Sequence, residues 1–265
     1  MSDGLDLVYR SIEEQHSEKP ANTRRQFVAG AAGTLGGLGL LGIPSLALGR
    51  AGGVKNDPQT ILNVAATAEV LATIVNTVGF EKALGGDETT QANVGAAARE
   101  ELIHYQTLVS PAVGGRPVTR RIWVPDAVFG DRTTFLSTLE VGDQIFINAY
   151  LIGVTAFGAA GNGKLARVAA EFMGAEAVHR ALARQSLGKL GNDRAFMRFN
   201  QREGAGDAPN SGAPGFTNVL IAVKQLEAAG FGFGKEGKGP GQFYDFADVS
   251  KRTPNPGAVN TRKPK

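Results

Sequence analysis

Residues 97–105 read AAREELIHY and residues 172–180 read FMGAEAVHR, so each stretch contains the pattern Glu-x-x-His. The pairs are Glu101 with His104 and Glu176 with His179, and these are the only histidines after residue 49. Residues three apart lie on one face of an α-helix, so both side chains of a pair can reach a single ion. A carboxylate on an apolar face is costly unless it is paired, protonated or bound to a cation. The two stretches therefore predict buried helices that share a metal site.

A second carboxylate precedes each of these stretches at nearly the same distance. Glu69 lies 32 residues before Glu101, and Asp143 lies 33 residues before Glu176. Glu69 is the only charged residue in the apolar segment 58–80. The chain thus repeats a helix with one carboxylate followed by a Glu-x-x-His helix. In a four-helix bundle this repeat supplies four carboxylates and two imidazoles to the bundle axis, as in di-iron and di-manganese proteins.

Helical periodicity and capping signals predict four long helices and one shorter helix. They span about residues 58–78, 88–109, 132–157, 164–190 and, for the shorter helix, 216–229. Asp57 followed by Pro58 is typical of a helix start, and Gly79 is expected to end the first helix. The connection 111–130 contains one strand-like run, 118–124.

Strands do not alternate with helices, which disfavours an α/β fold. The sequence predicts an all-α fold, a four-helix bundle with a long crossover between the second and third helices. The bundle is expected at residues 56–190. Residues 191–265 are expected to form a C-terminal extension with one short helix and an irregular, Gly/Pro-rich tail.

The first 49 residues resemble a twin-arginine export signal. Arg24 and Arg25 precede the uncharged segment 28–49, which ends in the small residues of the A-x-A-like sequence 47–49. This resemblance predicts recognition by the twin-arginine translocase, cleavage after Gly49 and a periplasmic or other extracytoplasmic location. The alternative is a membrane anchor or an uncleaved signal, since 22 apolar residues are enough to span a bilayer.

Composition excludes several classes of site. The chain has no cysteine, so disulfides, thiolate metal sites, iron–sulfur clusters and cysteine nucleophiles are excluded. A net charge of +3 is too small to indicate nucleic acid as the main partner. The sequence also lacks the G-x-S-x-G, P-loop and dinucleotide-binding signatures.

With these patterns in place, residues 56–190 resemble the ferritin-like superfamily, specifically the branch that includes desiccation-related and stress-related proteins. In that branch a carboxylate often lies seven residues before an Ala-Tyr pair on the third helix, as Asp143 lies seven before Tyr150 in DQIFINAY. The resemblance implies a site for two iron or manganese ions. Its ligands would be Glu69, Glu101, His104, Asp143, Glu176 and His179.

One position departs from the family pattern. The ligand on the third helix is usually glutamate, and Asp143 is one methylene shorter. Glu140 lies one turn away and is the alternative ligand, although its helix face is more polar than that of Asp143.

The neighbours of these residues allow more than one interpretation. Glu100 and Glu171 are expected to be solvated or ion-paired. Tyr105 and Tyr150 are expected in the core, with a place beside the metal ligands as the alternative. Arg180 follows His179 and is expected to face another side of its helix.

The resemblance implies oxidation of Fe(II), or a reaction with oxygen or peroxide, in stress protection. The alternative is a non-enzymatic desiccation or envelope protection protein whose metal is structural or absent. The tail segments 231–234 (FGFG) and 243–246 (FYDF), with the basic end 262–265, suit contact with an anionic envelope polymer. Iron storage in a closed cage is disfavoured, because some 75 residues follow the bundle.

Overall fold

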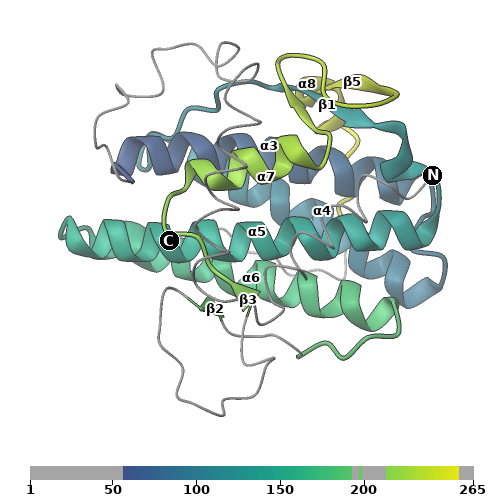
Figure 1. Ribbon diagram of the computed structural model, residues 1–265, viewed down its shortest axis with the longest axis horizontal. Coiled ribbons are helices and arrows are strands. Elements are labelled where there is room, and N and C mark those ends of the chain that lie inside the picture. Colours follow the sequence, from purple (N-terminus) through teal and green to yellow (C-terminus); the bar gives the residue numbers. More distant parts are fainter. Residues whose placement is uncertain (1–55, 193–196, 199–212, 257–265) are drawn as a thin grey trace, which may run out of the picture.

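The structure is a computed structural model that describes residues 56–192, 197–198 and 213–256 (Figure 1). The expected export signal, residues 1–49, lies outside the described residues, as does the basic C-terminal end. The described chain is mostly helical, with a small antiparallel sheet on one side of the helices.

Four long helices run side by side and form the body of the molecule (Figure 1). They are α3 (Pro58–Glu81), α4 (Glu88–Leu108), α5 (Arg132–Ala159) and α6 (Gly163–Ser186). Successive helices pair as α3 with α4 and α5 with α6, while α3 also contacts α5 and α4 contacts α6. All four helices were predicted, in this order.

Each long helix begins at an acidic or amide residue that caps its backbone. The side chain of Asp57 accepts from Gln59 N and Thr60 N, and those of Asp87, Asp131 and Asn162 accept from the N–H three residues on. Such caps satisfy N–H groups that have no partner inside a helix. The starts predicted at Asp57 and Asp131 are confirmed.

Two predicted helix ends are wrong. Gly79 does not end α3, which continues to Glu81. The glycine is needed for packing, because a Cβ at this position would overlap the fully buried ring of Phe135. Helix α6 ends at Ser186 rather than near residue 190, since Gly188 adopts φ +74° and turns the chain away.

Helix α3 is apolar on every side because the other elements surround it. It is long and apolar enough to cross a membrane by composition, yet 89% of its most apolar stretch is buried inside the protein. Burial in the bundle accounts for this composition, as in the central helix of any helical core.

The tail after residue 229 is not irregular, which corrects the all-α prediction. The crossover forms β1 (Arg121–Pro125) and the short 3-10 helix η1 (Asp126–Phe129). Strands β4 (Gly232–Phe233) and β5 (Gly241–Asp245) pair with β1 on either side in the order β4-β1-β5, both antiparallel. The register places Ile122 opposite Phe233 and Tyr244.

The glycines that suggested an irregular tail allow close approach to β1. A Cβ at Gly241 would lie 2.6 Å from Trp123 Nε1 and 2.6 Å from the Val124 carbonyl oxygen. Only glycine therefore fits beside the tryptophan at this point of the sheet.

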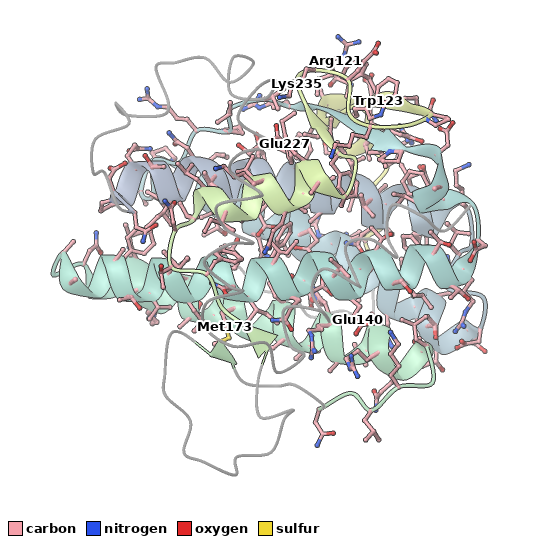
Figure 2. The ribbon with its side chains drawn as sticks, in the orientation of Figure 1. Arg121, Trp123, Glu140, Met173, Glu227 and Lys235 are labelled. Carbon is pink, nitrogen blue, oxygen red and sulfur yellow. The ribbon has the colours of Figure 1, made fainter. Side chains whose placement is uncertain are left out.

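The remaining elements hold the extension against the bundle. Helix α7 (Leu220–Ala228) contacts α5, and α8 (Phe246–Val249) contacts α3. Figure 2 labels Glu227 of α7 and Lys235, whose Oε1 and Nζ lie 3.1 Å apart. The segments β2 (Met197–Arg198) and β3 (Ala213–Pro214) pair in parallel.

Before α7, the backbone of Phe216 is fixed to the bundle by two hydrogen bonds. Phe216 N donates to Asn148 Oδ1, and Asn148 Nδ2 donates to Phe216 O, both at 2.8 Å. Asn148 is only 1% exposed, so this pair satisfies a buried amide on α5. The predicted short helix, 216–229, is therefore shorter at its start.

Candidate metal centre

The structure brings together all six residues that the sequence analysis named as ligands. They form two buried groups: Glu69, Glu101, His104 and Glu176, and Glu101, Asp143, Glu176 and His179. Within each group the nearest ligand atoms all lie within 4.8 Å of one another. Each of the four long helices contributes, so the centre exists only when the whole bundle is folded.

Glu101 and Glu176 belong to both groups and direct one oxygen towards each histidine. Glu101 Oε2 and Glu176 Oε1 lie 3.2 and 3.3 Å from His104 Nδ1. Glu101 Oε1 and Glu176 Oε2 lie 3.2 and 3.5 Å from His179 Nδ1. The two imidazole centroids are 6.5 Å apart. Two carboxylates thus lie between two adjacent candidate positions for an ion, each beside one imidazole nitrogen.

Each group is completed by one further carboxylate. Glu69 Oε2 lies 3.6 Å from His104 Nδ1, while Asp143 belongs to the group of His179. Glu69, Glu101 and Glu176 are 0% exposed, and the other three are at most 8% exposed. Both positions are therefore shielded from bulk water on most sides.

The polar atoms at this centre lack hydrogen-bond partners among the described residues. They are Glu69 Oε2, both carboxylate oxygens of Glu101 and of Glu176, Asp143 Oδ2, and the Nδ1 atoms of His104 and His179. A buried polar atom without a partner costs free energy, and buried polar atoms are normally satisfied. Eight such atoms from six residues, facing one volume, fit divalent cations as the missing partners.

The crowding of carboxylates perturbs the pKa values at the first position. Burial, followed by the negative charge of Glu101, raises the pKa of Glu69 to about 7. Burial alone would lower the pKa of His104, but the facing carboxylates of Glu69, Glu101 and Glu176 raise it well above its usual 6.5. Without a cation, the centre therefore retains protons near neutral pH.

The second position shows the same effect. Burial and the charge of Glu176 raise the pKa of Asp143 well above its usual value, although His179 and Arg180 act in the opposite direction. Arg180 is 6% exposed, and its positive charge lowers the pKa of Asp143 in opposition to burial.

The alternative ligand on α5, Glu140, has other partners. Its carboxylate pairs with Arg184 Nη1, and its Oε2 accepts from Lys189 Nζ at 2.8 Å. Both partners come from α6 or the residues that follow it, and Figure 2 shows Glu140 beside that helix. Of the two acidic residues on α5, the structure therefore places Asp143 in the ligand group.

Glu100 holds the imidazole of His179 in place. Its Oε2 lies 2.6 Å from His179 Nε2, the ring nitrogen that faces away from the centre. Burial would raise the pKa of Glu100, but this hydrogen bond and the charge of His179 lower it. Histidines that bind metals commonly donate their other N–H to a carboxylate, which fixes ring orientation and tautomer. The exposed Glu171 pairs with Arg167 instead, at 3.4 Å.

The two tyrosines have different surroundings. The hydroxyl of Tyr150 donates to Glu69 Oε1, and burial with the nearby charge of Glu69 raises the pKa of this phenol well above 10. The expectation of a plain core role for Tyr150 is therefore wrong. The rings of Tyr105 and Phe246 pack with their centroids 4.4 Å apart.

One cavity reaches the centre, and another lies beside Tyr150. An apolar cavity of about 50 Å³ lies between α3, α5 and α7 and is bounded by Tyr150. A smaller cavity of about 30 Å³ reaches Asp143 and His179 and is lined by several amide and hydroxyl side chains. The centre is thus enclosed but not sealed.

Carboxylate, imidazole and water ligands suit iron and manganese, whereas sites for softer metals use thiolates. The sequence has no cysteine and therefore no thiolate ligand. No family model, curated protein or solved structure matches this chain. The residues and their geometry therefore support a buried centre that could hold metal ions, without assigning the chain to a family.

Proposed function

We propose that the chain is a ferritin-like protein with a dinuclear iron or manganese centre, and that it oxidises Fe(II). One observation carries the proposal: Glu101 and Glu176 each direct one oxygen to each of two adjacent positions, and none of these oxygens has another partner among residues that the structure describes. A single-ion site would not need both oxygens of both carboxylates.

The six residues would have different ligand roles in such a centre. Glu69 and His104 would hold one ion, Asp143 and His179 the other, with Glu101 and Glu176 bridging them. When bound, an iron pair supplies one-electron donors beside a site for dioxygen or peroxide.

Two neighbours would control geometry and protons. Glu100 holds the ring of His179 through Nε2, which leaves Nδ1 free for the ion. Tyr150 donates to Glu69 Oε1 and so directs Oε2 towards the first position.

The redox balance of the proposed reaction requires only Fe(II), dioxygen and protons. Two Fe(II) ions each lose one electron, and one dioxygen molecule takes both electrons with two protons to give hydrogen peroxide. The protein supplies an enclosed site at which both ions are held close together. No organic substrate is part of this proposal.

Metal analysis of the purified protein tests the centre. After loading with Fe(II) without oxygen, or with Mn(II), we expect about two ions per chain. Glu101→Ala should reduce this content to one ion or fewer, because it removes a ligand from both positions. The control is Glu171→Ala, which alters an exposed ion pair on the same helix as Glu176 and should bind as the wild type does.

Aerobic oxidation separates a redox role from a structural one. Fe(II) should be oxidised faster with the wild type or Glu171→Ala than with buffer or Glu101→Ala. Two bound ions with no acceleration would favour the alternative, a protective protein whose metal is structural. Fewer than one ion per wild-type chain would overturn the dinuclear centre itself.

A further inference from the structure

The smaller cavity lies at the end of the bundle where α3 and α6 finish and α4 and α5 begin. Its walls include Asn76 of α3, Asn93 of α4 and Ser186 of α6. Its inner end is formed by Asp143 and His179, the two residues that serve only the second ion position. Its other walls include apolar side chains such as Leu136, Leu139 and Leu182. The cavity thus reaches one specific side of the centre.

Asn76 lines this cavity and carries a buried side-chain oxygen without a partner among the described residues. Its side chain is 3% exposed, and its Nδ2 donates to the Ala72 carbonyl oxygen at 3.1 Å. This bond fixes the amide orientation and leaves Oδ1 free, and Oδ1 has no hydrogen-bond partner within the described ranges. An amide oxygen is a good ligand for hard divalent cations, and leaving one buried and unsatisfied is costly.

The outer part of the cavity is closed by neutral hydroxyls and bordered by an acid. Thr90 Oγ1 donates to Asp87 Oδ2 at 2.7 Å, so Ser186 Oγ is the donor in its 2.9 Å bond to Thr90 Oγ1. This bond joins the first turn of α4 to the last residue of α6. Hydroxyl rotation of Ser186, which is partly exposed, can break this bond.

The other cavity does not suit a cation. Its walls are mainly the apolar side chains of α3, α5 and α7, such as Val64, Phe146 and Leu226. A divalent ion that sheds its water needs oxygen ligands along its path, and the apolar cavity offers few.

We infer that the smaller cavity is the passage by which divalent cations reach the centre, and that Asn76 Oδ1 is a transient ligand between its mouth and Asp143. The inference rests on the proposed function, because it requires a centre that binds metal. It also predicts the order of metal binding. The position of Asp143 and His179 is filled first, and that of Glu69 and His104 is filled second.

Stopped-flow absorption with Co(II) as the probe measures the loading rate, and the final metal content measures the centre. Asn76→Leu, of similar size but without the oxygen, should load about tenfold more slowly. Its final Co(II) content should equal that of the wild type. Asn93→Phe places a ring at the partly exposed mouth and should also slow loading, whereas Asn93→Ala should load at least as fast as the wild type.

The outcomes separate this passage from the centre. If the wild type binds no Co(II), the proposed centre fails. If the wild type binds Co(II) and both Asn76→Leu and Asn93→Phe load at its rate, the centre stands and the passage is wrong. Asn93→Phe changes a partly exposed residue, so it tests the passage even if Asn76→Leu does not fold.

Discussion

At the scale of single residues, the centre retains bound protons near neutral pH when no metal is bound. The folded pKa of Glu69 is about 7 against an ordinary value of 4.5, and those of His104 and His179 lie well above 6.5. For each group the proton is held more tightly in the folded chain than in the unfolded one. The contribution of Glu69 to the free energy of unfolding is therefore fully present below pH 4.5, and it is lost as the pH rises through about 7. Stability from the histidines is complete below pH 6.5 and lost as the pH rises through their folded pKa values.

These shifts predict how the metal-free protein responds to pH. After removal of metal with a chelator, the melting temperature should fall between about pH 5.5 and about pH 8. Capping residues such as Asp57 and Asp131 have lowered pKa values, so their titration changes the melting temperature only below this pH range. Thermal unfolding followed by circular dichroism measures the trend.

The metal-loaded protein provides the comparison, because ligands must lose their protons to bind a cation. Its melting temperature should not fall over the same range. A metal-free protein that becomes more stable as the pH rises from about 5.5 to about 8 would show that Glu69, His104 and His179 do not retain protons.

The residues that contact the centre differ in how far sequence could identify them. The Glu-x-x-His spacing is local, so it identifies Glu101, His104, Glu176 and His179 without knowledge of the fold. Glu100 is different: adjacent residues on a helix point about 100° apart, and only the packing of α4 against α6 brings Glu100 to His179. The free oxygen of Asn76 likewise depends on a cavity formed by four helices.

At the scale of elements, glycines inside helices record how closely the helices pack. Gly79 in α3 faces the ring of Phe135, whereas Gly142 in α5 would have no atom within 4 Å of an added Cβ. Both positions are helical, so alanine improves the intrinsic helix propensity equally at each.

This contrast predicts opposite effects of the same substitution. Gly142→Ala should stabilise the protein by roughly 0.5–1 kcal/mol, through propensity alone. Gly79→Ala should destabilise it by about 1–3 kcal/mol, because the ring of Phe135 must move within a packed core. Chemical denaturation of the two variants measures the difference, and equal effects would contradict the packing assigned to α3 and α5.

The helices could be predicted from sequence, but the sheet could not. Helix starts are local, since each cap is fixed by an Asp or Asn and its next three residues. Strand β1 was partly anticipated in the run 118–124. Its partners β4 and β5 are short, glycine-rich and more than 100 residues away, so no periodicity marks them.

At the scale of the whole molecule, the C-terminal segment is joined to the helices that carry the centre. Thr253 Oγ1 and Thr77 Oγ1 lie 3.0 Å apart, and Arg252 Nε lies 2.6 Å from Glu81 Oε1. The exposed ion pair contributes little. The larger contribution comes from Phe246, which is 6% exposed and packs on Tyr105 of α4.

This coupling predicts that sheet and bundle unfold together. Trp123 is the only tryptophan and lies on β1, so its fluorescence reports the sheet, while circular dichroism reports the helices. The two signals should change at the same temperature in the wild type.

Phe246→Ala should lower both transitions equally, by about 3–5 kcal/mol of unfolding free energy, because it leaves a cavity between α8 and α4. Gln242→Ala, at an exposed position of β5, should shift neither by more than about 0.5 kcal/mol. If Phe246→Ala shifts the tryptophan transition alone, the sheet folds apart from the bundle and does not support the centre.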